Sequence, residues 1–238
     1  MNQKGILYLI PNTLGGGEAL DLMSHTVQKV VGELRYFVVE NPKEARKFIK
    51  NICPELPQSE LNLFPLHKHV DRNEVNTYLD TCDQGINMGL VSDAGVPGVA
   101  DPGAEVVLLA HRKGIEVKPL VGPSSILLGM MASGMNGQSF AFNGYLPIEK
   151  SERKKAIQKF ERRSREEGQS QSFIETPYRN NKLIEDFMSF LSPETELCIA
   201  CDLSLETQWI KTKKIKQWKK EKPDIHKRPA LFIIHVNN

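Results

Sequence analysis

Residues 91–103 form the segment of this chain with the clearest capacity for ligand chemistry. They read Val-Ser-Asp-Ala-Gly-Val-Pro-Gly-Val-Ala-Asp-Pro-Gly. Glycine permits unusual backbone dihedral angles and a close approach of a ligand, whereas proline fixes φ. A buried strand is predicted before the segment and a helix over 104–111 after it. Open α/β sheets bind ligands at the carboxyl ends of their strands, so we predict a ligand-binding loop, with a tight strand-to-helix turn as the alternative.

A second glycine-rich segment, 11–18, follows the first predicted strand and reads Pro-Asn-Thr-Leu-Gly-Gly-Gly-Glu. Such a turn can hold an anion on backbone N–H groups, although a plain turn is the favoured interpretation here. The phosphate-loop pattern fails because no Gly-Lys-Ser/Thr follows, and the dinucleotide fingerprint fails because the glycines are consecutive. Glu40 stands about where that fingerprint expects a ribose-binding acid, so a nucleotide-dependent oxidoreductase stays an alternative.

Two short clusters have partial metal-ligand spacing. His67 and His69 share a face of an extended segment, but no Cys or third His lies nearby in the sequence. Cys198 and Cys201 lie in an apolar strand pattern, where residues three apart face opposite sides, and no second pair exists. We therefore predict no metal site, and we interpret these cysteines as core residues.

Two basic stretches, 150–165 and 211–222, could bind RNA through phosphate contacts. Acids interrupt the first stretch, which favours a solvated helix face laced with ion pairs. In the second, Trp209 and Trp218 accompany the lysines and only Glu221 opposes them. RNA binding and a solvated surface are both open there.

Short apolar runs alternate with amphipathic stretches along the whole chain. The predicted strands are 5–10, 36–39, 62–65, 86–92, 115–121, 140–144, 172–175, 196–201 and 231–236. This alternation predicts an α/β protein with two domains, mainly parallel sheets and a ligand cleft between the domains. Two prolines and a glycine in 119–123 interrupt the pattern, so we expect domains over 1–118 and 124–238 joined by a linker at 119–123.

Composition narrows the class of protein further. The 238 residues are 40% hydrophobic, which suffices for a core, and the formal net charge of +2 implies no strong global attraction to nucleic acid. No apolar run approaches the roughly 20 residues of a membrane span, and the first run is too short for a signal peptide. We expect a soluble cytoplasmic protein without membrane association.

Together these segments resemble the tetrapyrrole methylase family, and within it the branch that methylates a ribose 2′-hydroxyl of small-subunit ribosomal RNA. Residues 91–103 are close to that branch's Val-Ser-Asp-Ala-Gly-Thr-Pro-Gly-Ile-Ser-Asp-Pro-Gly. Gly-Pro-Ser-Ser at 122–125, followed by Ala-Ser-Gly at 132–134, matches the interdomain segment. Phe-Asn-Gly-Tyr-Leu-Pro at 142–147 matches the next strand, and Glu-Thr-Pro-Tyr-Arg at 175–179 is similar to Glu-Ser-Pro-His-Arg.

The resemblance implies S-adenosylmethionine as methyl donor, folded into the cleft between two α/β domains, and a homodimer. It also implies a donor site, whose residues would be Pro11, Ser92, Asp93, Ala94, Gly95, Pro97, Gly98, Val99, Ser124, Ser125, Leu146, Pro229 and Ala230. Asp93 would either accept a hydrogen bond from the donor's amino group or cap the loop.

The chain departs from the family most on the expected acceptor side. The family's Glu-Asp-Thr-Arg is Glu-Asn-Pro-Lys at 40–43, and its His-Glu-His-Asn is His-Lys-His-Val at 67–70. Its Ala-Arg-Glu-Leu-Thr-Lys is Ala-Cys-Asp-Leu-Ser-Leu at 200–205, without either basic residue. The first loop is shorter as well. Family and cofactor are therefore predicted more firmly than the RNA substrate.

Methyl transfer from a sulfonium is an in-line displacement, so the protein mainly positions donor and acceptor. A hydroxyl acceptor also needs its proton removed. Candidate bases in loops after strands are Glu40, His67, His69, Asp71, Asp101, Glu175 and Tyr178. The sequence singles out none of them.

We therefore predict an S-adenosylmethionine-dependent methyltransferase with ribosomal RNA or the small ribosomal subunit as partner. One alternative is a methylase of the same fold with a small-molecule or protein acceptor. A nucleotide-dependent oxidoreductase and a non-catalytic RNA-binding protein are the alternatives from other classes.

Overall fold

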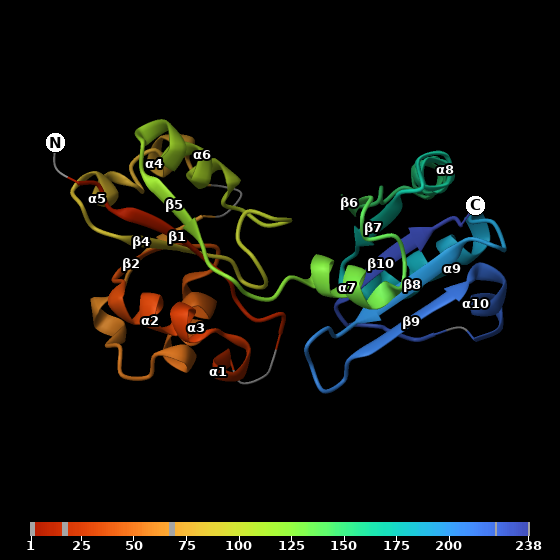
Figure 1. Cartoon of the computed structure of the whole chain (residues 1–238), viewed down its shortest axis with the longest axis horizontal. Coiled ribbons are helices and arrows are strands. Elements are labelled where there is room, and N and C mark those ends of the chain that lie inside the picture. Colours follow the sequence, from red (N-terminus) through yellow and green to blue (C-terminus); the bar gives the residue numbers. More distant parts are fainter. Residues whose placement is uncertain (1–2, 16–18, 67–69, 222, 238) are drawn as a thin grey trace. The chain divides into compact units, whose positions relative to one another are not determined.

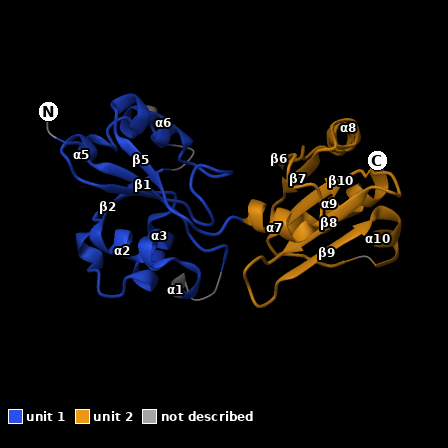
Figure 2. Cartoon of the chain, viewed as in Figure 1, with its two compact units in different colours: residues 1–124 blue, residues 125–238 orange. Residues whose placement is uncertain are grey.

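The computed structural model describes residues 3–15, 19–66, 70–221 and 223–237. The chain divides into two compact units, unit 1 over residues 1–124 and unit 2 over residues 125–238, which Figure 2 colours separately. Each unit has its own five-stranded sheet with helices packed on it (Figure 1). No helix in the described part of the chain has the length and hydropathy needed to cross a bilayer.

Unit 1 alternates strands and helices along the chain. Its elements are β1 (Ile6–Ile10), α1 (Ala19–Leu22), α2 (His25–Glu33), β2 (Tyr36–Val39), α3 (Pro42–Ile52), η1 (Gln58–Glu60), β3 (Asn62–Pro65), α4 (Arg72–Val75), α5 (Asp80–Asp83), β4 (Met88–Val91), α6 (Ala104–Lys113) and β5 (Glu116–Pro119). The strand order is β3-β2-β4-β1-β5, and every pairing between these strands is parallel.

Helices cover both faces of this parallel sheet (Figure 1). One core joins α2 and α3 to the sheet, and the other joins α4, α5 and α6. Every residue of β4 is buried, as expected for a central strand covered on both sides. The sheet is therefore a rigid base for the loops at its carboxyl edge.

Helix α3 shows how the sequence specifies one of these elements. Pro42 occupies its first turn, and the side chain of Asn41 accepts a hydrogen bond from the N–H of Lys43. Both features favour a helix start at this position. Its buried residues are Ala45, Phe48, Ile49 and Ile52, which recur at helical spacing.

Unit 2 carries a sheet of different topology. Its elements are α7 (Ser125–Ser133), β6 (Phe140–Tyr145), α8 (Lys150–Glu167), β7 (Ser170–Ile174), η2 (Pro177–Arg179), α9 (Asn180–Phe190), β8 (Glu196–Cys201), β9 (Trp209–Lys214), α10 (Ile215–Glu221) and β10 (Ala230–His235). The strand order is β6-β7-β10-β8-β9. Only β6 and β7 pair in parallel, and the other three pairings are antiparallel.

The prediction of a mainly parallel sheet is therefore wrong for unit 2. Residues 202–208 join β8 to β9, and a connection of this length cannot make the crossover that parallel neighbours require. Strand β9 was also missing from the predicted elements, because lysines alternate with Thr212 and Ile210 and hide the apolar pattern of a strand.

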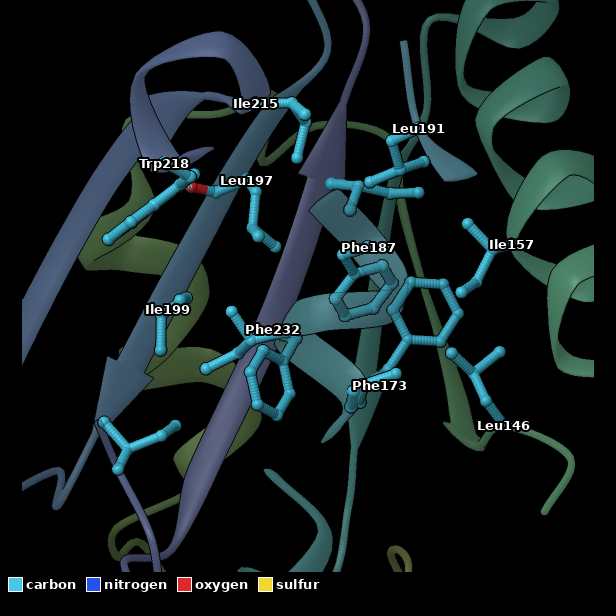
Figure 3. Packing of buried hydrophobic residues seen from close by; sticks show 14 of the residues in the cluster. Leu146, Ile157, Phe173, Phe187, Leu191, Leu197, Ile199, Ile215, Trp218 and Phe232 are labelled. Atoms are coloured by element: carbon cyan, nitrogen blue, oxygen red, sulfur yellow. Dashed lines mark hydrogen bonds between the residues drawn. The ribbon is translucent and has the colours of Figure 1, made fainter. Parts of the chain in front are cut away.

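The core of unit 2 lies between the sheet and helices α8, α9 and α10 (Figure 3). The rings of Phe173 and Phe232 both pack on Phe187, with centroid distances of 5.9 and 5.8 Å. Trp218 is fully buried, and its indole N–H donates a hydrogen bond of 2.9 Å to the carbonyl of Leu197. Helix α7 packs against β8, β9 and β10.

Candidate functional site

The carboxyl edge of the unit 1 sheet contains a topological switch point between the adjacent strands β2 and β4. The chain leaves β2 toward β3 on one side, and it leaves β4 toward β5 on the other. Adjacent strands whose connections diverge leave a crevice where α/β sheets bind ligands. Segment 92–103 follows β4, and segment 11–15 follows β1, the neighbour of β4 on its other side. These are the two glycine-rich segments identified in the sequence.

Asn12 ties these two loops together. Its backbone N–H donates to the carbonyl of Gly95 at 2.7 Å, and the N–H of Gly95 donates to the carbonyl of Thr13 at 3.3 Å. The buried Asn12 side chain donates from Nδ2 to the carbonyls of Ser92 and Asp93 at 3.0 and 3.1 Å. Asn12 therefore fixes the shape of the candidate site, although the sequence prediction named only its neighbour Pro11.

The loop after β4 depends on backbone conformations that favour glycine. Gly95 has a φ of 68° and Gly103 a φ of 130°. A Cβ on Gly103 would lie 3.0 Å from Leu90 Cδ2 and 3.3 Å from the N atom of Gly98. Ala100 also has a positive φ, 64°, which is costly for a residue with a side chain. The loop thus has a strained, defined shape of the kind found at ligand sites.

Carboxylates gather at this edge. The N–H of Asp93 donates to Glu40 Oε2 at 3.3 Å. Partial burial raises the pKa of Asp93, and the charges of Glu40 and Glu44 raise it further. Burial likewise raises the pKa of Asp101 to about 6, with further contributions from the charges of Glu40 and Asp93. The edge has a negative potential that would favour a cationic ligand.

A pocket of about 320 Å³ lies beside the switch point in unit 1. Its lining comes from the loops after β1 and β4 and from α3, and consists of Asn12, Thr13, Leu14, Gly15, Glu44, Lys47, Phe48, Asn51, Asp93 and Ala94. The volume falls at the lower end of the range for small-molecule sites. Asp93 and Ala94 are the predicted donor-site residues that line it.

The other predicted donor residues divide between the units. Ser92, Pro97, Gly98 and Val99 belong to the loop after β4, and Pro11 directly follows β1. Ser124 is the last residue of unit 1, and Ser125 begins α7.

In unit 2, three predicted residues lie at one edge of the sheet. Leu146 directly follows β6, which runs parallel to β7, and Ala230 begins β10, which is antiparallel to β7. The carbonyl of Pro229 accepts a hydrogen bond of 2.9 Å from the N–H of Asp202. The side chain of Leu146 is part of the core, so only its backbone can face a ligand.

The candidate bases occupy different environments. His67 and His69 lie outside the described residues. Asp71 accepts a hydrogen bond from the N–H of Asn73 at the start of α4. Glu175 is buried, and its Oε1 accepts hydrogen bonds from Arg179 and from the N–H of Thr176. Asp101 and Glu40 are the candidates that the fold places at the switch point.

Ion pairs occupy much of the two basic stretches. In 211–222, Lys213 pairs with Glu221, and both Lys214 and Lys216 pair with Glu194. These lysines belong to β9 and α10, and Glu194 lies in the loop before β8. These carboxylates offset much of the positive charge that RNA binding by this stretch would require.

In 150–165, the side chain of Arg153 points inward and donates to Asp186 at 2.7 Å. Lys155 and Arg163 pair with carboxylates of α8 itself. Both pairs are exposed, which matches the favoured interpretation of this stretch as a solvated helix face. Cys198 and Cys201 are buried in β8, as the strand pattern predicted.

Solved structures of other proteins show the same fold. A TM-score of 0.63 and 18% identity relate the chain to the methyltransferase CobJ, over 97% of this chain and 94% of that one. A uroporphyrin-III C-methyltransferase from Thermus thermophilus, complexed with S-adenyl homocysteine, gives a TM-score of 0.57 and 14% identity over 97% of each chain. The chain therefore has the tetrapyrrole methylase fold, and the predicted α/β fold class is confirmed.

Curated relatives point to one branch of that fold. A protein of Vibrio cholerae named ribosomal RNA small subunit methyltransferase I is 26% identical over 98% of this chain and 78% of its own length. A Bacillus subtilis protein of the same name is 29% identical over 85% of this chain and 65% of its own length. No family model matches the chain. The resemblance stated from the motifs is confirmed by these similarities.

Proposed function

We propose that this chain is an S-adenosylmethionine-dependent methyltransferase that methylates a ribose 2′-hydroxyl of small-subunit ribosomal RNA. The proposal rests on two findings that agree: similarity over nearly all of this chain to proteins named for that RNA, and a strained loop at the switch point of unit 1. A neighbour in the same fold binds S-adenyl homocysteine, which is the donor without its methyl group.

The residues of unit 1 fit the donor's chemistry. When bound, S-adenosylmethionine supplies a methyl group on a positively charged sulfur. Asp93, Asp101 and Glu40 give the carboxyl edge of the sheet the negative charge that favours such a cation. The glycines of the loop allow its backbone to approach a ligand closely. Following the family resemblance, we propose that Ser124, Ser125, Leu146, Pro229 and Ala230 also contribute to donor binding.

Asp101 is our choice for the group that accepts the proton from the acceptor hydroxyl. Its carboxylate has a pKa of about 6, so it is mostly ionised at neutral pH yet more basic than an ordinary aspartate. A base with a pKa near the working pH combines the correct protonation state with a useful driving force for proton transfer. Its role would be to hold that proton on a carboxylate oxygen as the methyl group is transferred.

We also propose that the protein acts in the cytoplasm, where ribosomal subunits are found, and that it acts as a homodimer. The dimer follows from the family resemblance. Sedimentation of the full chain at micromolar concentration measures it, and a monomer there would contradict it.

Transfer of a labelled methyl group tests the function. The full chain is incubated with tritiated S-adenosylmethionine and isolated small ribosomal subunits, with large subunits as the control substrate. We expect label in the small-subunit RNA. Alkaline hydrolysis should then leave the label in dinucleotides, because a methylated 2′-oxygen cannot attack the adjacent phosphate.

Donor binding without label in any RNA would contradict an RNA acceptor and favour a small-molecule or protein acceptor. Binding of NADH in place of the donor would favour an oxidoreductase. RNA binding without donor binding would favour a non-catalytic RNA-binding protein.

A further inference from the structure

An exposed aromatic and basic cluster in unit 2 is no part of the carboxyl edge of unit 1, and it includes Tyr178, one of the candidate bases named from the sequence. It consists of Tyr178, His226 and Lys227, and we refer to it as the tyrosine platform. Tyr178 is 71% exposed, which is unusual for a large aromatic side chain. Its ring meets that of His226 edge to face at a centroid distance of 6.0 Å, and Lys227 Nζ lies 5.8 Å from its centroid. A flat, open ring beside a cation is thus available on the surface.

Backbone hydrogen bonds hold the two halves of the platform together. Tyr178 lies in η2, whereas His226 and Lys227 lie in the loop before β10. The N–H of Lys227 donates to the carbonyl of Pro177 at 3.1 Å, and Lys227 itself has a positive φ of 62°. A strained residue persists only where its surroundings fix it.

Two asparagines at the start of α9 add further links to the same loop. Asn180 Nδ2 donates to the carbonyl of Arg228 at 2.6 Å. Asn181 accepts from the N–H of Ile225 at 3.0 Å and donates to Asp224 at 2.7 Å. The platform is therefore preorganised, so a partner would not have to bear the entropy of ordering it.

The cations around the platform differ in their availability. Arg179 pairs with Glu175, and Arg228 pairs with Asp202, so carboxylates compensate both guanidinium groups. In the described part of the chain, the ammonium of Lys227 has a contact with the ring of Tyr178 and no carboxylate partner. Lys227 is thus free to contact an anion next to the ring.

The platform occupies the edge of the unit 2 sheet that also carries predicted donor residues. Strand β7 ends at Ile174, four residues before Tyr178, and Ile174 pairs with Leu231 in β10. Lys227 precedes β10 at the same edge, where Pro229 and Ala230 also lie. Within unit 2, the platform is therefore a neighbour of the residues assigned to the donor.

We propose that the tyrosine platform binds a single-stranded segment of the RNA acceptor, with one base stacked on Tyr178 and a phosphate contacting Lys227. The proposal rests on the proposed function. Every base has a flat π-face, so an exposed aromatic ring can stack on it without sequence preference. A lysine beside the ring supplies the phosphate contact that single-strand binding uses. The chain lacks the family's basic residues at positions 201 and 205. The tyrosine platform would supply contacts to RNA in their place.

The test uses a fluorescein-labelled single-stranded RNA 12-mer containing 2-aminopurine, without methyl donor. We expect Tyr178→Ala to weaken binding about 5- to 100-fold and to abolish the quenching of 2-aminopurine that stacking causes. Tyr178→Phe keeps the ring and should bind as the wild type does. Lys227→Gln should lower the slope of log affinity against log salt by about 0.7, the value for one phosphate contact to a single strand.

Lys29→Gln, at an exposed position of α2 in unit 1, is the matched control and should leave affinity and salt slope unchanged. If Tyr178→Ala binds and quenches as the wild type does, the tyrosine platform is overturned while the RNA methyltransferase proposal stands. If the wild type binds the donor but neither binds this RNA nor labels small-subunit RNA, both proposals fail. Thermal unfolding of each variant confirms that it is folded before binding is measured.

Discussion

The carboxyl edge of the unit 1 sheet and the tyrosine platform of unit 2 are built from different groups, backbone in the first and side chains in the second. At the switch point of unit 1, backbone groups and glycines shape the site, and Asn12 binds the two loops through main-chain carbonyls. In unit 2, exposed side chains such as Tyr178 and Lys227 form the candidate acceptor surface. A loop shaped by its backbone requires glycine and proline at fixed positions, so it can be recognised in a sequence. Whether a lysine is free to contact an anion depends on carboxylates elsewhere in the chain, so it cannot be recognised there.

The largest effect should come from a branched side chain in the loop after β4. We expect Gly95→Val to weaken S-adenosylmethionine binding at least about tenfold, because φ is 68° there and Leu14 lies 3.4 Å from the added Cβ. The expected loss in free energy of unfolding is about 1–3 kcal/mol. Calorimetry with the folded variant measures the affinity.

Gly168→Val is the matched control for that change. Gly168 also has a positive φ, 60°, but it caps α8 in unit 2 and has no neighbour within 4 Å of an added Cβ. We expect a similar loss of stability with unchanged donor affinity. Equal donor affinities for the Gly95 and Gly168 variants would mean that the loop only serves the fold.

A somewhat smaller effect is expected from Asn12→Ala, which removes the side-chain bonds between the two loops. The buried carbonyl of Ser92 and the partly buried carbonyl of Asp93 lose their donor, so we expect the free energy of unfolding to fall by about 1–3 kcal/mol. Donor affinity should fall with it, because the loop after β4 loses its restraint. Urea unfolding and calorimetry on the same preparation separate the two effects. A loss of stability without any change in donor affinity would mean that Asn12 stabilises the fold and has no role in donor binding.

The acid at position 101 gives a pH-dependent prediction. The pKa of Asp101 is raised from 3.8 to about 6 in the folded protein, so the folded state binds this proton more tightly than the unfolded state. The ionised carboxylate therefore destabilises the fold increasingly as the pH rises from 3.8 to about 6, and fully above that. We expect Asp101→Asn to raise the free energy of unfolding at pH 8 by about 1–2 kcal/mol, and the gain to vanish below about pH 4.

The same variant tests the link between this charge and the donor. Wild-type affinity for S-adenosylmethionine should fall as the pH drops through about 6, and that pH dependence should be absent in Asp101→Asn. Asp21→Asn, at an exposed position of α1, is the control that should keep the wild-type profile. If donor affinity depends on pH in Asp101→Asn as it does in the wild type, Asp101 has no role in donor binding.

The smallest effect is expected from the lysine-rich stretch of unit 2. Replacing Lys213, Lys214 and Lys216 by Gln together should lower RNA affinity by no more than about threefold, because Glu194 and Glu221 already pair with these lysines. Filter binding at two salt concentrations measures it beside Lys227→Gln. A larger loss of RNA affinity in the triple variant than in Lys227→Gln would mean that the RNA-binding surface lies on β9 and α10.

The sequence predicted the fold best where local pattern decides the structure. The buried apolar run of β4 and the Pro-Gly loop after it are local features, and both lie where they were expected. Strand β9 could not be predicted because its lysines alternate with Thr212 and Ile210 and hide the apolar pattern, and the carboxylates that pair with them, such as Glu194, lie in other elements. The role of Asn12 depends on a contact 80 residues away in the chain. The loop motifs thus indicated the site, but the pairing of its side chains required the fold.

A crystal structure of the full chain with S-adenosylhomocysteine is the decisive test of the donor site. We expect the ligand to lie at the carboxyl ends of β1 and β4 and to contact the backbone of Ser92, Asp93, Ala94 and Gly95. The carboxylate of Asp101 should lie near the position of the transferred methyl group. A ligand bound away from the loop after β4, with residues 92–95 free of contact, would contradict this donor site.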